Sequence, residues 1–115
     1  GLLFGAGHET TTNLIGNGLL ALHRQPDQWE RLKADPSLIP NAVEELLRYD
    51  SSVQLTGRVT SAEVEIGGVV LPAGESVIAL LGAANRDPAQ YPDPDRLDVG
   101  REHIRPMSFG GGIHH

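Results

Sequence analysis

The sequence contains no cysteine in its 115 residues. Disulfides, zinc sites built on thiolates and cysteine nucleophiles are therefore excluded for this chain as written. Positive charge is also scarce, because nine Lys and Arg residues stand against fifteen Asp and Glu and leave a formal net charge of −6. A nucleic-acid partner would require a surplus of Lys and Arg to neutralise its phosphates. We therefore expect no nucleic-acid partner.

Long hydrophobic runs are absent as well. The apolar stretches fall far short of the roughly 20 residues that a membrane-spanning helix requires, and no signal peptide is visible. We expect no membrane segment and a cytoplasmic location.

Lys33 is the single lysine beside eight arginines. Arginine suits fixed ion pairs with carboxylates, although a GC-rich genome would also favour arginine over lysine. A hydrophobic fraction of 39% and a charged fraction of 21% are typical of a globular protein.

Proline, glycine and apolar spacing divide the chain into helices followed by short strands. Pro26 and Pro36 each interrupt a helical pattern, and Gly67-Gly68 between two β-branched runs indicates a two-residue hairpin. The predicted order is a helix over 1–24, a helix over 26–35, a helix over 37–49, a β-meander over 52–81 with a buried strand at 77–81, a long ordered loop over 85–108, and a glycine-rich loop over 109–115. The predicted class is α+β, mostly α.

The stretch AGHETTTN places polar side chains in the middle of the first helix. The Thr10 hydroxyl can donate a hydrogen bond to the carbonyl of Ala6, four residues earlier, and so loosen that turn of the helix. With Glu9 beside it, such a turn could pass protons into a pocket. The alternative is a polar helix face near solvent. A zinc-protease site is excluded, because His8-Glu9 is not followed by a second His four residues on.

Two further motifs are weak when each is taken alone. In EELLRYD, Glu44 and Glu45 lie four and three residues before Arg48, a spacing that most often gives surface ion pairs. In FGGGIHH, the glycines allow a backbone to approach a flat ligand. The closing His114 and His115 could instead belong to a plain loop or an affinity tag, or bind a metal together with His103.

In their order along the chain, these motifs resemble the cytochrome P-450 family, the haem-thiolate monooxygenases, and most of all its soluble bacterial members. The order is Glu9-Thr10, then Glu-x-x-Arg, then Arg58, then NRDP…PDPDRLD, then Phe-Gly-x-Gly-x-His. The resemblance covers the whole chain but only the C-terminal part of a family chain. We therefore expect part of the cytochrome P-450 fold and not a complete domain.

The family's loop reads Phe-x-x-Gly-x-His/Arg-x-Cys. Phe109, Gly112 and His114 match it, and the iron-ligating cysteine would be the next residue after His115. The resemblance thus implies a fragment without a metal ligand of its own. Many relatives carry a histidine three residues before the phenylalanine, where this chain has Pro106; Arg105 could substitute for it.

The resemblance implies a role for each matching residue. Glu9 and Thr10 would relay protons as the catalytic pair. The residues that would contact the cofactor are Ala6 and Gly7 on the oxygen side, Phe109 and Gly112 in the haem loop, and Arg58 and His114 at the propionates. Glu45, Arg48 and a third partner, Arg96, would form a structural ion cluster behind the haem loop.

For the whole protein, the resemblance implies haem b, activation of O₂ and oxidation of a small organic substrate. Electrons would come from NAD(P)H through a ferredoxin or flavoprotein. This chain alone is expected to be inactive, because the thiolate that activates oxygen is absent. The alternative is an inactive stand-alone helical module that binds a partner. Self-association is expected because apolar side chains lie around most of the circumference of the first helix. These residues are Leu2, Leu3, Phe4, Leu14, Ile15, Leu19 and Leu20.

Overall fold

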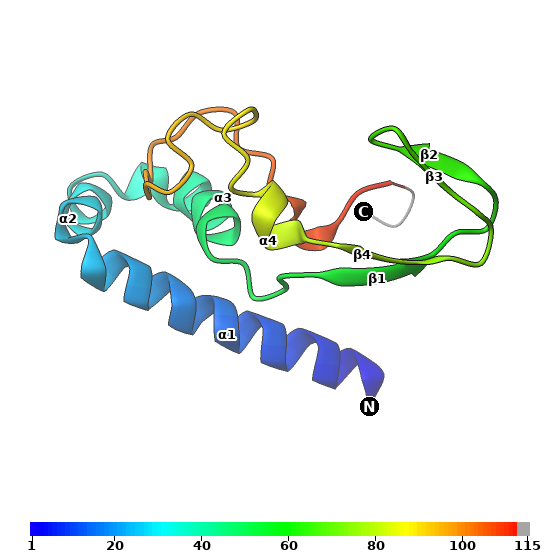
Figure 1. Ribbon diagram of the computed structural model, residues 1–115. Helices are drawn as coiled ribbons and strands as arrows, with labels where there is room; N and C mark the ends of the chain where they lie inside the picture. The colour runs from blue at the N-terminus through cyan, green and yellow to red at the C-terminus, as the bar shows by residue number, and fades with distance from the viewer. Residues whose placement is uncertain (113–115) are drawn as a thin grey trace.

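The computed structural model describes residues 1–112, except for the side chains of Leu2 and Leu3. Helices and short strands follow one another as predicted, which confirms the α+β class (Figure 1). The elements are α1 (Leu2–Arg24), α2 (Pro26–Ala34), η1 (Pro36–Leu38), α3 (Ile39–Tyr49), β1 (Thr56–Val59), β2 (Val64–Ile66), β3 (Val69–Leu71), β4 (Ser76–Ala79), α4 (Leu81–Ala84) and η2 (Met107–Phe109).

Helix α1 runs unbroken along one side of the molecule (Figure 1). The Thr10 hydroxyl donates to the Ala6 carbonyl at 2.8 Å, as predicted, but the helix continues through this turn, so the expected loosening is wrong. Proline sets the next boundary, because Pro26 occupies the first turn of α2, where its missing N–H costs no hydrogen bond. Within residues 1–112, none of the helices combines the length and the apolar character required to cross a membrane.

The third predicted helix, 37–49, is divided in the structure. Its first turn is the 3₁₀ helix η1, which is followed by α3. Asp35 begins η1 by accepting a hydrogen bond from the Ser37 N–H at 3.1 Å, as a capping residue does. Helix α2 ends at Ala34, one residue before the predicted boundary.

The strands form a nested hairpin and not the predicted meander. β2 pairs with β3, and β1 pairs with β4 outside them, both antiparallel (Figure 1). Gly67 and Gly68 have φ values of 59° and 82°, which a two-residue hairpin turn requires. The buried strand expected at 77–81 is wrong: Ile78 in β4 is 64% exposed, and Leu81 belongs to α4.

A small core joins the helices to the loop that connects α4 and η2. Its buried members are Ala21, Leu22, Ala42, Leu97 and Val99, with Leu32, Leu38, Leu46 and Tyr49 packed around them. Helix α1 closely approaches α3 at Gly18, where an added Cβ would lie 3.1 Å from Leu46 Cδ1. The loop therefore contributes core side chains although it has no regular structure.

The molecule is extended, and much of α1 is uncovered. Its radius of gyration is 16.6 Å, whereas a compact domain of this length would have about 13 Å. Phe4, Ile15, Leu19 and Leu20 are 79%, 57%, 52% and 46% exposed. A helix with apolar side chains on an exposed face belongs in a larger core, which agrees with a partial fold.

Candidate functional site

A fully buried ion pair lies within α3. Glu45 and Arg48 both have 0% side-chain exposure. Arg48 Nε donates to Glu45 Oε2 at 2.7 Å, and its Nη2 donates to Glu45 Oε1 at 2.9 Å. The pair is bidentate, a geometry that strengthens the interaction and fixes both side chains. The predicted pairing is therefore present, and it uses Glu45 and not the exposed Glu44.

A second guanidinium completes this cluster, and it is that of Arg101. Its Nε donates to Glu45 Oε1 at 3.1 Å, and its side chain is 10% exposed. Arg96, the expected third partner, is exposed and contributes only its carbonyl oxygen, which accepts from Arg48 Nη2 at 3.1 Å and from Arg101 Nη2 at 2.9 Å. This corrects the expectation for the Arg96 side chain.

Backbone carbonyls of the 85–108 loop satisfy the remaining N–H groups of Arg48. Its Nη1 donates to Asn85 O at 2.9 Å and to Pro94 O at 2.8 Å. All five guanidinium N–H groups of Arg48 therefore have partners, the full number that arginine can offer. The carbonyls also offset the surplus positive charge, because two guanidiniums share the Glu45 carboxylate. We call Glu45, Arg48 and Arg101 the ion cluster.

A cleft of about 270 Å³ lies between α1, the end of α3 and η2. It brings together three of the predicted site residues: Ala6 and Thr10 from α1, and Phe109 from η2. The complete lining is Ala6, Thr10, Thr11, Leu14, Leu47, Ser51, Ser52, Val53, Ser108 and Phe109. Residues about one hundred positions apart in the sequence thus share one cavity.

One buried hydroxyl in this cleft has no hydrogen-bond partner among residues 1–112. Ser51 is 3% exposed, and among the described residues nothing hydrogen-bonds to its Oγ. Such a buried hydroxyl costs about 1–3 kcal/mol unless a bound group satisfies it. Gly110, which follows Phe109 of the lining, has a φ of 75°, and an added Cβ there would meet no atom within 4 Å. The cleft therefore suits an occupant with a polar edge.

Comparison with known proteins decides the family. The family model described as Cytochrome P450 matches residues 1–101. This chain belongs to the cytochrome P-450 family. The vitamin D(3) 25-hydroxylase of Pseudonocardia autotrophica is 56% identical over 98% of this chain and 28% of its own length. The biotin biosynthesis cytochrome P450 of Bacillus subtilis is 50% identical over 98% of this chain and 29% of its own.

Solved structures agree with the family. P450BioI in complex with an acyl carrier protein carrying hexadec-9Z-enoic acid superposes with a TM-score of 0.95 and 50% identity, over 98% of this chain and 30% of that one. The tirandamycin C-bound P450 monooxygenase TamI gives 0.94 and 48%, over 98% and 29%. The chain thus spans less than a third of the cytochrome P-450 proteins that it matches.

Several residues whose roles were expected from the resemblance to cytochrome P-450 proteins do not line the cleft. Gly7 and Glu9 are exposed on α1. The Arg58 guanidinium is used within β1, where its Nη1 donates to Thr56 Oγ1 at 2.7 Å and to Gly57 O at 2.8 Å. Glu9, Gly7 and Arg58 therefore lack a contact with the cleft in this structure.

The glycine-rich segment of the cytochrome P-450 loop borders a second hollow, of about 580 Å³. Gly112, Arg105, Pro106 and Phe109 line it, so Arg105 lies near the loop as the substitution at Pro106 would require. His114 and His115 lie outside the described residues. Within residues 1–112, no group of three His, Cys, Asp or Glu side chains is arranged to hold a metal.

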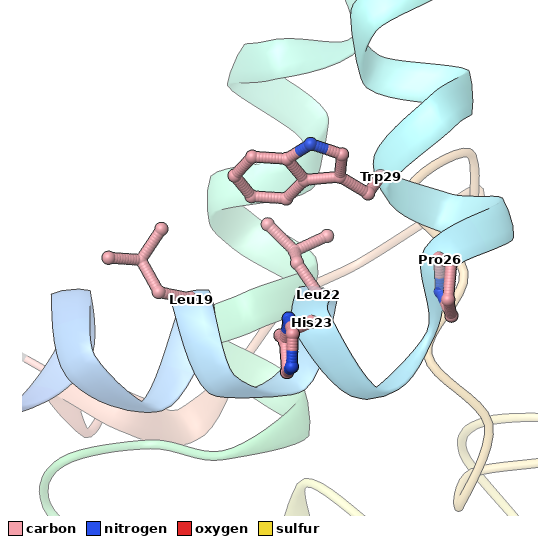
Figure 2. A pocket seen from close by; sticks show the side chains of 5 residues that line it. All are labelled: Leu19, Leu22, His23, Pro26 and Trp29. Atoms are coloured by element: carbon pink, nitrogen blue, oxygen red, sulfur yellow. The ribbon is translucent and has the colours of Figure 1, made fainter.

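A third cavity, of about 500 Å³, lies where α1 meets α2. Figure 2 shows its lining side chains, Leu19, Leu22 and His23 from α1 with Pro26 and Trp29 from α2. These residues are mostly apolar, and none was predicted as a site residue. The cavity continues the exposed apolar side of α1 toward α2.

The loop is also attached to α2 through Asp98. Its Oδ1 accepts from Arg31 Nη1 at 2.7 Å and from the Gly100 N–H at 3.0 Å. Burial acts to raise the pKa of the Asp98 carboxyl, but the Gly100 hydrogen bond and the Arg31 guanidinium outweigh it and lower that pKa below its ordinary value. Asp98 therefore favours its charged form in the folded chain.

The sequence did not identify three residues of this site. Arg101 belongs to the ion cluster, and Asn85 accepts from Arg48 through its backbone carbonyl. Ser51 is buried and lines the cleft. Asn85 begins the NRDP motif, and its place in that motif could have marked it as a candidate site residue. Arg101 and Ser51 lie outside any motif, and only the folded contacts identify them.

Proposed function

We propose that this chain forms the oxygen-facing helix and the start of the haem loop of a haem-dependent monooxygenase. The single observation that supports this most is the cleft in which Ala6 and Thr10 of α1 meet Phe109 of η2. The unpartnered Ser51 hydroxyl gives the same cleft a polar contact for a bound group. The iron-ligating cysteine would come from the residues that follow His115 in a whole protein.

Haem held by a thiolate would supply the activation of O₂. The residues of this chain would line the space around the haem and bind its carboxylates. Ala6, with its small side chain, leaves room beside α1, and Phe109 covers the loop side of the cleft. Arg58 and His114 would bind carboxylates through charge-assisted hydrogen bonds; the contacts of Arg58 with Thr56 and Gly57 use only its Nη1.

Thr10 is the residue best situated for proton transfer. Its hydroxyl hydrogen is held by the Ala6 carbonyl at 2.8 Å, and Thr10 lines the cleft. A hydroxyl in this position can accept a hydrogen bond from a bound molecule on one side and remain oriented by the helix on the other. Glu9, exposed beside it, would exchange protons between solvent and this turn.

The substrate and the electron donor belong to the whole protein. We propose a small organic substrate, and electrons from NAD(P)H delivered by a ferredoxin or flavoprotein. The names of two relatives describe hydroxylases of different organic molecules, vitamin D(3) and 6-deoxyerythronolide B. The identity of the substrate depends on residues that this chain does not contain.

A chimera tests the proposal. Residues 1–115 replace the aligned segment of the Bacillus subtilis biotin biosynthesis cytochrome P450, which supplies the cysteine and the remaining fold. We expect the chimera to bind haem and to give the red-shifted carbon monoxide band of thiolate ligation. A folded, soluble chimera without haem would refute the proposal and favour a stand-alone binding module.

Thr10→Ala in the chimera tests the proton route. We expect NAD(P)H consumption to continue while hydrogen peroxide replaces much of the oxygenated product. Thr12→Ala is the matched control, because the Thr12 hydroxyl makes the same kind of bond, to His8 O at 2.7 Å, but Thr12 is exposed and does not line the cleft. Equal coupling in the two variants would remove Thr10 from the proton route.

A further inference from the structure

Asn85 links the loop to η2 through its side chain. It is 0% exposed. Its Oδ1 accepts from the Met107 N–H at 2.7 Å, and its Nδ2 donates to Ser108 Oγ at 3.2 Å. Both residues belong to η2, the turn that leads directly into the glycine-rich segment. One buried amide thus fixes two consecutive residues of that turn.

The same asparagine is attached to the ion cluster and to α3. Its backbone carbonyl accepts from Arg48 Nη1 at 2.9 Å. Ser108 Oγ in turn donates to Leu47 O at 2.7 Å, so the hydroxyl receives one hydrogen bond and gives another. Asn85 therefore lies between Arg48 on one side and η2 on the other.

The attachment extends to the next residues of the loop. The Gly110 N–H donates to Met107 O at 2.8 Å, and Phe109 lines the cleft beside Thr10. Gly110 has a positive φ of 75°, a backbone conformation that glycine tolerates and that redirects the chain. The path of the glycine-rich segment thus starts from a turn whose orientation is set by Asn85.

We infer that Asn85 is a positioning residue for the glycine-rich segment that would contact the cofactor. Asn85 holds η2, so that the segment after η2 has one fixed path. The inference rests on the proposed function, because it concerns how the loop presents its cofactor ligand. The side chain needs both a donor and an acceptor. An aspartate would direct an oxygen at Ser108 Oγ, whose hydrogen is already given to Leu47 O, and would bury a charge.

The test compares Asn85→Ala with Asn41→Ala in the haem-loaded chimera. Asn41 is a matched control, because its Nδ2 also donates two hydrogen bonds to the loop, to Val99 O at 2.9 Å and to Arg101 O at 3.0 Å. Those contacts lie away from η2. Both variants therefore lose two side-chain hydrogen bonds, but only Asn85→Ala releases the turn before the glycines.

We expect Asn85→Ala to release haem about tenfold faster, equivalent to about 1.4 kcal/mol. Part of its carbon monoxide complex should lose the red-shifted thiolate band. For Asn41→Ala we expect a lower urea midpoint with haem release and spectrum unchanged within about twofold. The same loss of haem and of band in both variants would overturn the inference, since the effect would then come from general destabilisation.

Ser108→Ala decides the matter if Asn85→Ala does not accumulate as folded protein. It removes the hydroxyl between Asn85 and Leu47 but leaves the Asn85–Met107 bond. We expect haem release to increase by about threefold, with a smaller spectral change. An unchanged release rate and spectrum would overturn the inference. Failure of the unsubstituted chimera to bind haem would instead refute the proposed function.

Discussion

Glu45→Gln is the substitution that most directly tests how the loop is held. Oε1 of Glu45 accepts from Arg48 Nη2 and Asp98 N, both at 2.9 Å, and from Arg101 Nε at 3.1 Å, while among residues 1–112 Oε2 accepts only from Arg48 Nε. The glutamine oxygen would therefore take the Oε1 position. Its NH₂ would then face Arg48 Nε, so that two donors oppose each other across 2.7 Å.

The expected cost follows from the lost charge. Two guanidiniums, with side-chain exposures of 0% and 10%, would have no carboxylate between them. Breaking a buried ion pair by removing one partner costs about 3–5 kcal/mol. That is a large part of the 5–15 kcal/mol by which folded domains are typically stable. Exposed Glu44→Gln is the control, and we expect a change within about 0.5 kcal/mol.

Urea unfolding of the chimera, followed by far-ultraviolet circular dichroism at equal haem loading, measures the difference. Midpoint and slope together separate a loss of stability from a change in compactness. Arg48→Met in the Glu45→Gln background should cost less than the sum of the two single changes, because only the Arg101 guanidinium then lacks its carboxylate. Equal midpoints for Glu45→Gln and Glu44→Gln would refute the reasoning.

Three further predictions follow. Arg48→Lys should cost about 2–4 kcal/mol in the same urea assay, because lysine offers three donors where arginine offers five; an unchanged midpoint would contradict this. Because the pKa of Asp98 is lowered on folding, its carboxylate stabilises the fold above the ordinary pKa of about 3.9, and this stability is lost as pH falls through the lower folded-state pKa; Asp98→Asn should flatten the decrease in the unfolding free energy below about pH 4, and parallel acid limbs would be the contrary result. The isolated 115-residue chain should self-associate or bind a hydrophobic dye through the exposed side of α1, and should not give the thiolate carbon monoxide band; sedimentation showing a monomer with a cooperative unfolding transition and no dye binding would contradict the first part.

Local chemistry made much of the fold predictable. The spacing of Glu45 and Arg48 is short enough that a helix brings them together, and the two glycines at 67 and 68 determine their turn. The Thr10 hydrogen bond to Ala6 also followed from a spacing of four residues. The loosening of the helix did not follow, because α1 continues through this turn although the Thr10 hydroxyl also donates to the Ala6 carbonyl.

What could not be predicted depends on contacts between distant parts of the chain. Whether Arg96 or Arg101 reaches Glu45 depends on the path of an irregular loop, for which no periodicity exists. The pairing of β1 with β4 encloses the β2–β3 hairpin, and a local pattern cannot separate this from a meander. The cleft likewise needs α1 and η2 to meet, which only the packed structure establishes.

The carbonyls around Arg48 and Arg101 have a consequence for the order of folding. Arg48 and its acceptor in Arg96 are 48 residues apart, and Asn41 reaches Arg101 across 60. The local hydrogen bonds of this loop, such as Tyr91 N–H to Asp87 O at 2.9 Å, form turns but do not bring it to α3, and closing such long segments is entropically costly. We therefore expect α3 to form early and the loop to wrap around its arginine late. The turn that leads to the glycines would order last, so that a cofactor would arrive at a chain whose scaffold is already folded and whose final segment is still closing.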